Sequence, residues 1–272
     1  MRLRWILFIA IALCLIGGLI AGANSRAIEA ALTAPGKANT TQGYGAPSPT
    51  KGTTPQPTQK PSKPTQPASP TPVQGNAQVL AKDTFMRASQ VLWGTASDGR
   101  KWQGDANSIE VFSITQGIGQ INAGQGAFNA ILGPATADAD IVFSATVNHF
   151  TADGLVNIGA ALRWTDGNNW YKALIDGTQI QILSRVRGTT HVLATAPFAA
   201  QGGVSYTLRF RVLGANLLAK AWRSDQPEPA TWTIMATDTT FAQGMGGIRV
   251  LLQSTTVVRV TSFLETAVSA TA

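Results

Sequence analysis

Hydrophobic and polar residues alternate with a period of two along most of the chain after residue 82, and no long helical pattern competes with this alternation. Glycine, asparagine, aspartate and proline separate the alternating runs, as expected of strands joined by turns. The pattern predicts strands at 83–87, 108–115, 119–122, 140–147, 156–164, 170–176, 179–186, 192–196, 205–212, 217–222, 231–236, 246–252 and 257–265. Because so many short strands bury their apolar faces only by stacking, we expect an all-β, two-sheet antiparallel jelly-roll sandwich.

The N-terminal residues have a different character. Arg2 and Arg4 precede an apolar run, 5–23, of nineteen uncharged residues, which is about the length that begins to span a bilayer. Basic residues before such a run place the N-terminus inside and all later residues outside. We expect a single-pass anchor in the cell membrane, or a signal peptide that is cleaved after Ala23 and leaves a secreted protein, because residues 21–23 have the form of a cleavage site.

Residues 27–78 are rich in proline, threonine and glutamine. Ten of the fourteen prolines lie between residues 35 and 72, together with four lysines and no acid. A segment of this composition buries little and stays extended. The expected organisation is an N-terminal transmembrane or signal helix (1–26), a disordered linker (27–78), a β-sandwich domain (79–266) and a short tail (267–272).

The formal net charge of +7 comes entirely from the N-terminal part of the chain. Up to Lys82 there are eight basic residues and one acid, Glu29, whereas thirteen of each follow from Asp83 onward. The domain itself is therefore neutral, which argues against a nucleic-acid partner. The single cysteine, Cys14, lies in the apolar run, which excludes disulfides within the chain and cysteine-based zinc sites.

Two predicted hairpins place like charges opposite one another. A two-residue turn at 214–215 sets Arg209 opposite Lys220 on the outward face of the first hairpin. In the second hairpin, a loop at 166–169 pairs Trp164 with Tyr171 inward and Arg163 with Lys172 outward. Like charges directly opposite on a sheet are destabilising, so each pair requires an explanation.

Two interpretations of these charges stay open. In the first, an acid from a neighbouring strand meets each pair, or the charges only prevent edge-to-edge aggregation. In the second, the outward face binds a sugar polymer, and an acidic polymer in particular, because aromatic faces stack on sugar rings and arginine forks bind carboxylate or sulfate. The candidate carbohydrate-binding residues are Arg163, Trp170, Lys172, Arg209, Lys220, Trp222, Trp102, Asn168 and Asn169. Of these, Trp102 follows a polar loop and either rims a groove or packs beneath the first strands.

Three stretches of sequence resemble the concanavalin A-like lectin/glucanase superfamily, and within it the laminin-G-like modules of bacterial extracellular proteins. They are the opening DTFMR at 83–87, the block GAALRWTDGNNWYKA at 159–173, and the run YTLRFRV at 206–212 with LAKAW at 218–222. The resemblance implies a two-sheet jelly roll whose first and last strands lie side by side. It also implies a structural calcium ion, for which Asp83 and Glu265 could supply carboxylates. Alternatively, Asp83 caps a turn and Glu265 is merely exposed.

The acids do not form a pattern typical of catalysis. Glycoside hydrolysis normally needs two carboxylates beside the scissile bond, which glucanases of this superfamily carry as Glu-x-Asp-x-x-Glu, and that motif does not occur in the chain. The glutamates of the domain, Glu110, Glu228 and Glu265, lie far apart in sequence. His149 and His191 have neither metal-site spacing nor an evident catalytic partner. We therefore expect no enzymatic activity.

The sequence thus favours a membrane-tethered, extracytoplasmic and non-catalytic lectin-like module that binds a glycan or another surface polymer. One alternative is an adhesion, structural or sensor head that engages a protein partner. A glycoside hydrolase of the same fold is the third.

Overall fold

The computed structural model describes residues 78–122 and 124–269, so the predicted membrane or signal segment and nearly all of the predicted linker lie outside the described residues. The described part of the chain forms sixteen strands and one short 3-10 helix, η1, and contains no helix long and apolar enough to cross a membrane. The elements are β1 (Val79–Asp83), β2 (Gln90–Val91), β3 (Gln103–Gly104), η1 (Asp105–Asn107), β4 (Phe112–Thr115), β5 (Ile118–Asn122), β6 (Gly126–Thr136), β7 (Ala139–Val147), β8 (Asn157–Asp166), β9 (Asn169–Ile175), β10 (Gln179–Val186), β11 (Thr189–Pro197), β12 (Ser205–Leu213), β13 (Asn216–Arg223), β14 (Ile234–Thr237), β15 (Gly244–Leu252) and β16 (Val257–Ala267).

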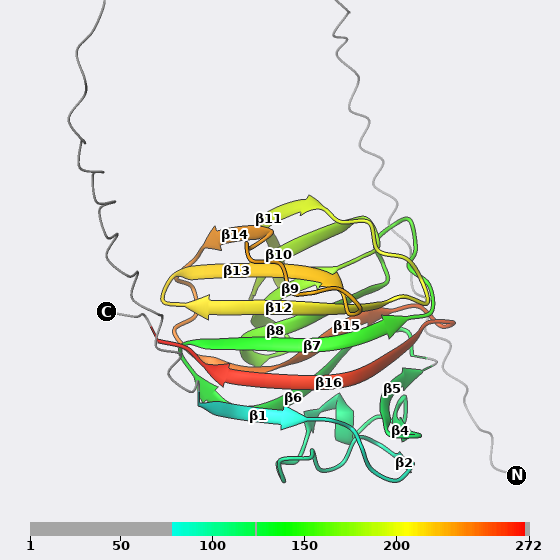
Figure 1. Cartoon of the computed structure of the whole chain (residues 1–272). Coiled ribbons are helices and arrows are strands. Elements are labelled where there is room, and N and C mark those ends of the chain that lie inside the picture. The colour runs from blue at the N-terminus through cyan, green and yellow to red at the C-terminus, as the bar shows by residue number, and fades with distance from the viewer. Residues whose placement is uncertain (1–77, 123, 270–272) are drawn as a thin grey trace, which may run out of the picture. The chain divides into compact units, whose positions relative to one another are not determined.

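The strands form two stacked antiparallel sheets, with β12, β7 and β16 of one sheet in front of β9, β8 and β15 of the other in Figure 1. The nine-stranded sheet has the order β14-β13-β12-β7-β16-β5-β4-β2, and β1 also pairs with β16. The seven-stranded sheet has the order β11-β10-β9-β8-β15-β6-β3. The predictions of an all-β fold, of two antiparallel sheets and of adjacent first and last strands are confirmed.

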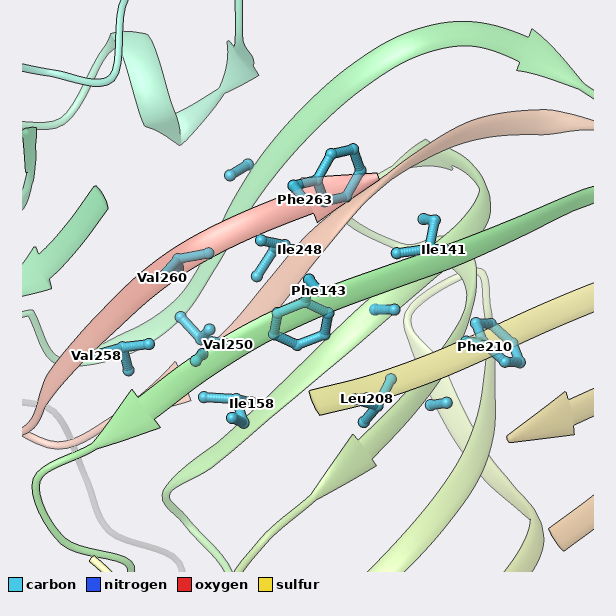
Figure 2. Close-up of a cluster of buried hydrophobic side chains, with 14 of the residues drawn as sticks. Ile141, Phe143, Ile158, Leu208, Phe210, Ile248, Val250, Val258, Val260 and Phe263 are labelled. Carbon is cyan, nitrogen blue, oxygen red and sulfur yellow. The ribbon is translucent and has the colours of Figure 1, made fainter. Parts of the chain in front are cut away.

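The core lies between the two sheets and is built from alternate residues of each strand. Figure 2 shows Phe143 of β7 and Phe263 of β16 among Ile158 of β8 and Ile248 and Val250 of β15. All of these side chains are at most 1 % exposed. Burial of each contributes roughly 1.5–3 kcal/mol, which explains why the period-two pattern is so regular in these strands.

The strand prediction misses β2, β3 and β6 and misplaces the first strand. The alternation predicts no strand between 122 and 140, yet β6 fills most of that interval because its glycines, and Pro134, interrupt the pattern without ending the strand. The first strand is predicted at 83–87, whereas β1 ends at Asp83. Phe85 adopts a left-handed φ of 58°, which lies outside the φ range of regular strand residues.

The β12–β13 hairpin has the predicted register. Arg209 lies opposite Lys220, and Thr207 lies opposite Trp222. The two-residue turn at 214–215 sets this register, and Gly214 provides the positive φ of 56° that the turn needs.

The predicted register of the β8–β9 hairpin is wrong by two residues. Tyr171 lies opposite Leu162 rather than Trp164, and Lys172 lies opposite Ala161 rather than Arg163. The turn is two residues long, with Asp166 paired to Asn169, and a bulge between Leu162 and Asp166 absorbs the extra residues. As a result, Trp164 packs on the outer face of the sheet instead of in the core.

Candidate functional site

Arg163 forms the bulge in β8 and serves as a clamp between loops. Its backbone is left-handed, with a φ of 47°, and its side chain is 4 % exposed. The guanidinium donates to the carbonyls of Ala137 (2.8 Å), Phe241 (2.6 Å) and Gly214 (2.7 Å), and to Asp138 Oδ1 (3.2 Å). These contacts hold the unfavourable backbone conformation in place, and they give the side chain a structural role.

The outer face of the nine-stranded sheet carries Arg209 and Lys220, and acids meet both of them. Buried Asp140 of β7 accepts a hydrogen bond from Arg209 Nη2 at 2.6 Å and also pairs with Arg211. Glu228 lies 2.7 Å from both Arg209 Nη1 and Lys220 Nζ. Burial alone would raise the pKa of Glu228, but hydrogen bonds from Lys220 and Arg209 outweigh it and hold that pKa below its usual value.

A loop also covers these charges. Lys220 Nζ donates to the carbonyl of Pro229 at 2.6 Å and lies 4.9 Å from the ring centre of Trp232, over which Arg209 and Arg211 also pack. The interpretation in which acids meet the like charges is thus confirmed for this hairpin. Half-buried Trp222 lies beside them on β13.

The outer face of the seven-stranded sheet is different, because its cations meet no acid. Trp170 and Lys172 point outward from β9, and Arg185 of β10 lies opposite Trp170. Arg249 of β15 lies opposite Gly159 of β8. Within the described residues, no ion pair includes Lys172, Arg185 or Arg249.

Lys172 is 4 % exposed and its side chain lies across β8. A Cβ added at Gly159 would come within 2.6 Å of Lys172 Cε, so only glycine leaves room for the lysine at this position. The ammonium donates to Asn157 Oδ1 at 2.6 Å. Both the aliphatic part and the ammonium of this side chain are thus buried, and Asn157, which accepts from the ammonium, also lines the cavity.

Arg249 packs on the face of Trp170, with its guanidinium carbon 4.7 Å from the ring centre. It donates to Asn129 Oδ1 of β6. Asn129 is in turn held by Asp105 Oδ2, which accepts from its backbone N–H at 2.7 Å and from its side chain at 3.2 Å. Because Arg249 covers the indole, Trp170 is only 3 % exposed and supports the arginine more than it offers an open stacking surface.

Burial and mutual repulsion lower the pKa values of Lys172 and Arg249. Burial, and secondarily the charge of Arg249, hold the pKa of Lys172 well below its usual value. Burial, followed by the charge of Arg185, lowers the pKa of Arg249 to about 10, although Asp105 acts in the opposite direction. Arg249 thus stays charged at neutral pH, whereas burial disfavours the charged form of Lys172, and no described carboxylate forms an ion pair with either group.

A cavity of about 310 Å³ lies between these side chains. Trp170, Leu174, Leu183 and Leu251 form its apolar wall. Its polar lining residues are Asn157, Lys172, Arg185, Thr190 and Arg249, and no carboxylate is among the described residues that line it. The cavity therefore offers hydrogen-bond donors beside an apolar surface.

Of the predicted carbohydrate-binding residues, the structure brings only Trp170 and Lys172 into this cavity. Asn168 and Asn169 form the adjoining turn, where Asn169 Nδ2 donates to Asp166 and the Asn168 carbonyl accepts from Gly188. Arg163 lies in the bulge of β8, and Arg209, Lys220 and Trp222 lie on the nine-stranded sheet. Trp102 is buried.

Four polar residues of the cavity, Asn157, Arg185, Thr190 and Arg249, were not among the sequence candidates. Arg249 is the one charged residue of an otherwise apolar strand, which is a signal that the sequence does carry. Its position beside Lys172 depends on the pairing of β15 with β8, residues about ninety positions apart, which local patterns do not reveal.

Asp83 and Glu265 do not fit the calcium site that the family resemblance implies. Both oxygens of Asp83 are occupied by donors, including Phe85 N–H at 2.8 Å, Trp102 Nε1 at 2.7 Å and the Arg87 guanidinium at 2.9 Å. Asp83 thus caps a turn, as the alternative interpretation states. Glu265 is 0 % exposed, so the interpretation of it as merely exposed is wrong. Among the described residues, no group of three or more potential metal ligands occurs.

The sequence matches no family model and no curated protein. Solved structures with a similar fold include the carbohydrate-binding module CBM66 from Bacillus subtilis, with 18% identity, 59% of this chain and 94% of that chain covered, and a TM-score of 0.47. Another is the xylan β-1,4-xylosidase from Bacillus halodurans C-125, with 10% identity, 68% and 38% covered, and a TM-score of 0.51. A GH43 protein from Bacillus licheniformis has 14% identity, 69% and 39% covered, and a TM-score of 0.51.

The chain spans about two fifths of the length of these last two structures. The likeness is one of fold, namely a two-sheet antiparallel sandwich.

Proposed function

We propose that the described domain is a non-catalytic, lectin-like jelly roll of the concanavalin A-like superfamily, of the laminin-G-like kind, and that it binds a glycan on the outer face of its seven-stranded sheet. The observation that carries the proposal is the cavity in which Lys172, Arg185 and Arg249 lie beside the apolar wall that includes Trp170. Sugars present hydroxyl groups and apolar C–H faces together, and a site of this composition complements both.

The distribution of carboxylates supports binding over hydrolysis. No carboxylate is among the described residues of the cavity, and Oε1 of Glu228 pairs with Arg209 and Lys220 on the opposite sheet. A glycosidase needs an acid and a base or nucleophile on either side of the scissile bond. Release of reducing sugar from β-glucans or xylan by the purified protein would contradict a non-catalytic function.

The proposal extends to location. The apolar run 5–23 holds the domain outside the cell membrane, and the linker 27–78 spaces it from the surface; cleavage after Ala23 would instead release it. Mass spectrometry of the mature protein tests this, because a chain that begins at Asn24 contradicts the anchor.

A glycan array probed with the full-length protein in a sugar-free detergent tests the function. Two tryptophans provide a matched pair, since Trp170 lines the cavity and Trp222 lies on the outer face of the other sheet. We expect Trp170→Ala to lose binding and Trp222→Ala to retain it. Absence of binding to any glycan would overturn the proposal and favour a protein partner.

A further inference from the structure

The cavity on the seven-stranded sheet contains more positive charge than neutral sugars require. Lys172, Arg185 and Arg249 all line it, and none of them has an acidic partner among the described residues. The cations of the opposite sheet, Arg209 and Lys220, meet Asp140 or Glu228. The same chain therefore neutralises one group of cations with its own acids and leaves another group without them.

The hydrogen-bond donors of the three cations are also largely unused. Lys172 uses one donor, to Asn157; Arg185 uses one, to Thr190 at 2.9 Å; and Arg249 uses one, to Asn129. The buried Nε of Arg185 has no partner among the described residues. An ammonium has three donors and a guanidinium has five, so the site has donors available for a ligand with several acceptor oxygens.

The surrounding structure keeps the cations close together despite their repulsion. Gly159 makes room for Lys172, Trp170 supports Arg249, and Asp105 orients Asn129, which accepts from Arg249. Holding like charges together in a partly buried site costs free energy, which a bound anion offsets through charge-assisted hydrogen bonds.

From these contacts we infer that the cavity binds the anionic group of an acidic polysaccharide, a carboxylate or a sulfate, with the sugar ring against the leucines of the apolar wall. This inference rests on the proposed glycan-binding function and specifies its ligand class. The volume of about 310 Å³ is at the lower end of the range of small-molecule sites, about 300–1,000 Å³, and suits one sugar unit with its acidic group.

The first test compares ligands that differ only in charge, using full-length protein in a sugar-free detergent and a binding titration at moderate salt. One arm compares polygalacturonate with its methyl ester, and the other compares dextran sulfate with dextran. We expect the charged member of at least one pair to bind at least about tenfold more tightly than its neutral counterpart, as charge-assisted hydrogen bonds imply. The arm that responds identifies carboxylate or sulfate as the group that is bound.

The second test locates the site. Arg249→Gln should weaken acidic-polymer binding about tenfold or more, while Arg249→Lys should retain part of it. Arg259→Gln is the matched control, since this exposed arginine lies on β16 of the other sheet, and we expect less than a twofold effect. Near-ultraviolet circular dichroism establishes that each variant is folded, and the first test needs no variant.

The outcomes separate the inference from the proposed function. If neutral and charged polymers bind equally, the anionic specificity is wrong and glycan binding stands. If Arg249→Gln and Arg259→Gln weaken binding equally, attraction to general surface charge explains the effect and the cavity assignment is wrong. If no polysaccharide binds, the proposed function fails and the inference fails with it.

Discussion

The stability of this domain should decrease as the pH rises, because Glu265 is buried without a partner. The side chain is 0 % exposed, and neither carboxylate oxygen has a hydrogen-bond partner among the described residues. Gly133 and Gly246 make room for it; a Cβ at Gly133 would lie 2.8 Å from Oε2. Burial raises the pKa of Glu265 to about 8, although Arg100 acts in the opposite direction.

The sign of the effect follows from proton binding. The folded state binds the proton more tightly than the unfolded state, so the full contribution to stability is present below the usual pKa of 4.5 and is lost as the pH rises through about 8. At about 1.4 kcal/mol for each pKa unit, the loss amounts to about 5 kcal/mol across this window. That is a large share of the 5–15 kcal/mol that typically stabilises a domain.

The assay is urea denaturation of the wild type and Glu265→Gln at half-unit steps from pH 4 to pH 9, followed by tryptophan fluorescence. Lys172 titrates in the opposite direction, since its pKa is lowered, so the difference between the two proteins isolates Glu265. We expect similar stability near pH 4 and a progressively more stable Gln variant toward pH 9. Exposed Glu110→Gln serves as the control. A wild-type-to-variant difference that is constant from pH 5 to pH 9 would refute the reasoning.

Three further predictions concern the clamp, the cavity and the core. Arg163→Met should destabilise the domain by about 3 kcal/mol in the same denaturation assay, because four hydrogen bonds are lost. Arg187→Met is the control and should have little effect, because Arg187 is exposed and has a similar φ of 48°. Gly159→Ala should displace Lys172 and press on the Ala173 carbonyl oxygen, which a Cβ at this position would approach too closely, at a cost of about 1–3 kcal/mol in thermal denaturation; acidic-polymer binding should weaken, and unchanged affinity would count against the role of Lys172. Phe143→Ala should cost about 3–5 kcal/mol, and a much smaller loss of urea stability would contradict the packing in Figure 2.

The two hairpins show how far the sequence alone predicts this fold. Gly214 fixes the two-residue turn between β12 and β13, and counting outward from it gives the correct pairing of Arg209 with Lys220. The same counting fails in the β8–β9 hairpin because Arg163 adopts a left-handed conformation. That conformation depends on carbonyls from three distant loops, so no local property of the sequence predicts it.

The sequence predicts those residues of the candidate site that lie close together in the chain, but not those that distant strands bring to it. Trp170 and Lys172 are close in sequence, and their outward phase on one strand identifies them together. Asn157 joins them through the bulged pairing of β8 with β9, and Arg249 through the pairing of β15 with β8, which tertiary structure decides. The acids that neutralise Arg209 and Lys220 also come from distant segments, so the sequence could not distinguish the two faces.

The place of β16 in the nine-stranded sheet has a consequence for biogenesis. This last strand lies between β7 and β5 and also pairs with β1, so it occupies the interior of the layer. A nascent polypeptide that still lacks these residues has no means of joining the two parts of that layer. Closure of this layer therefore waits for the synthesis of β16, and a premature stop before Val257 would leave two half-layers that no strand joins, with their apolar surfaces exposed to water.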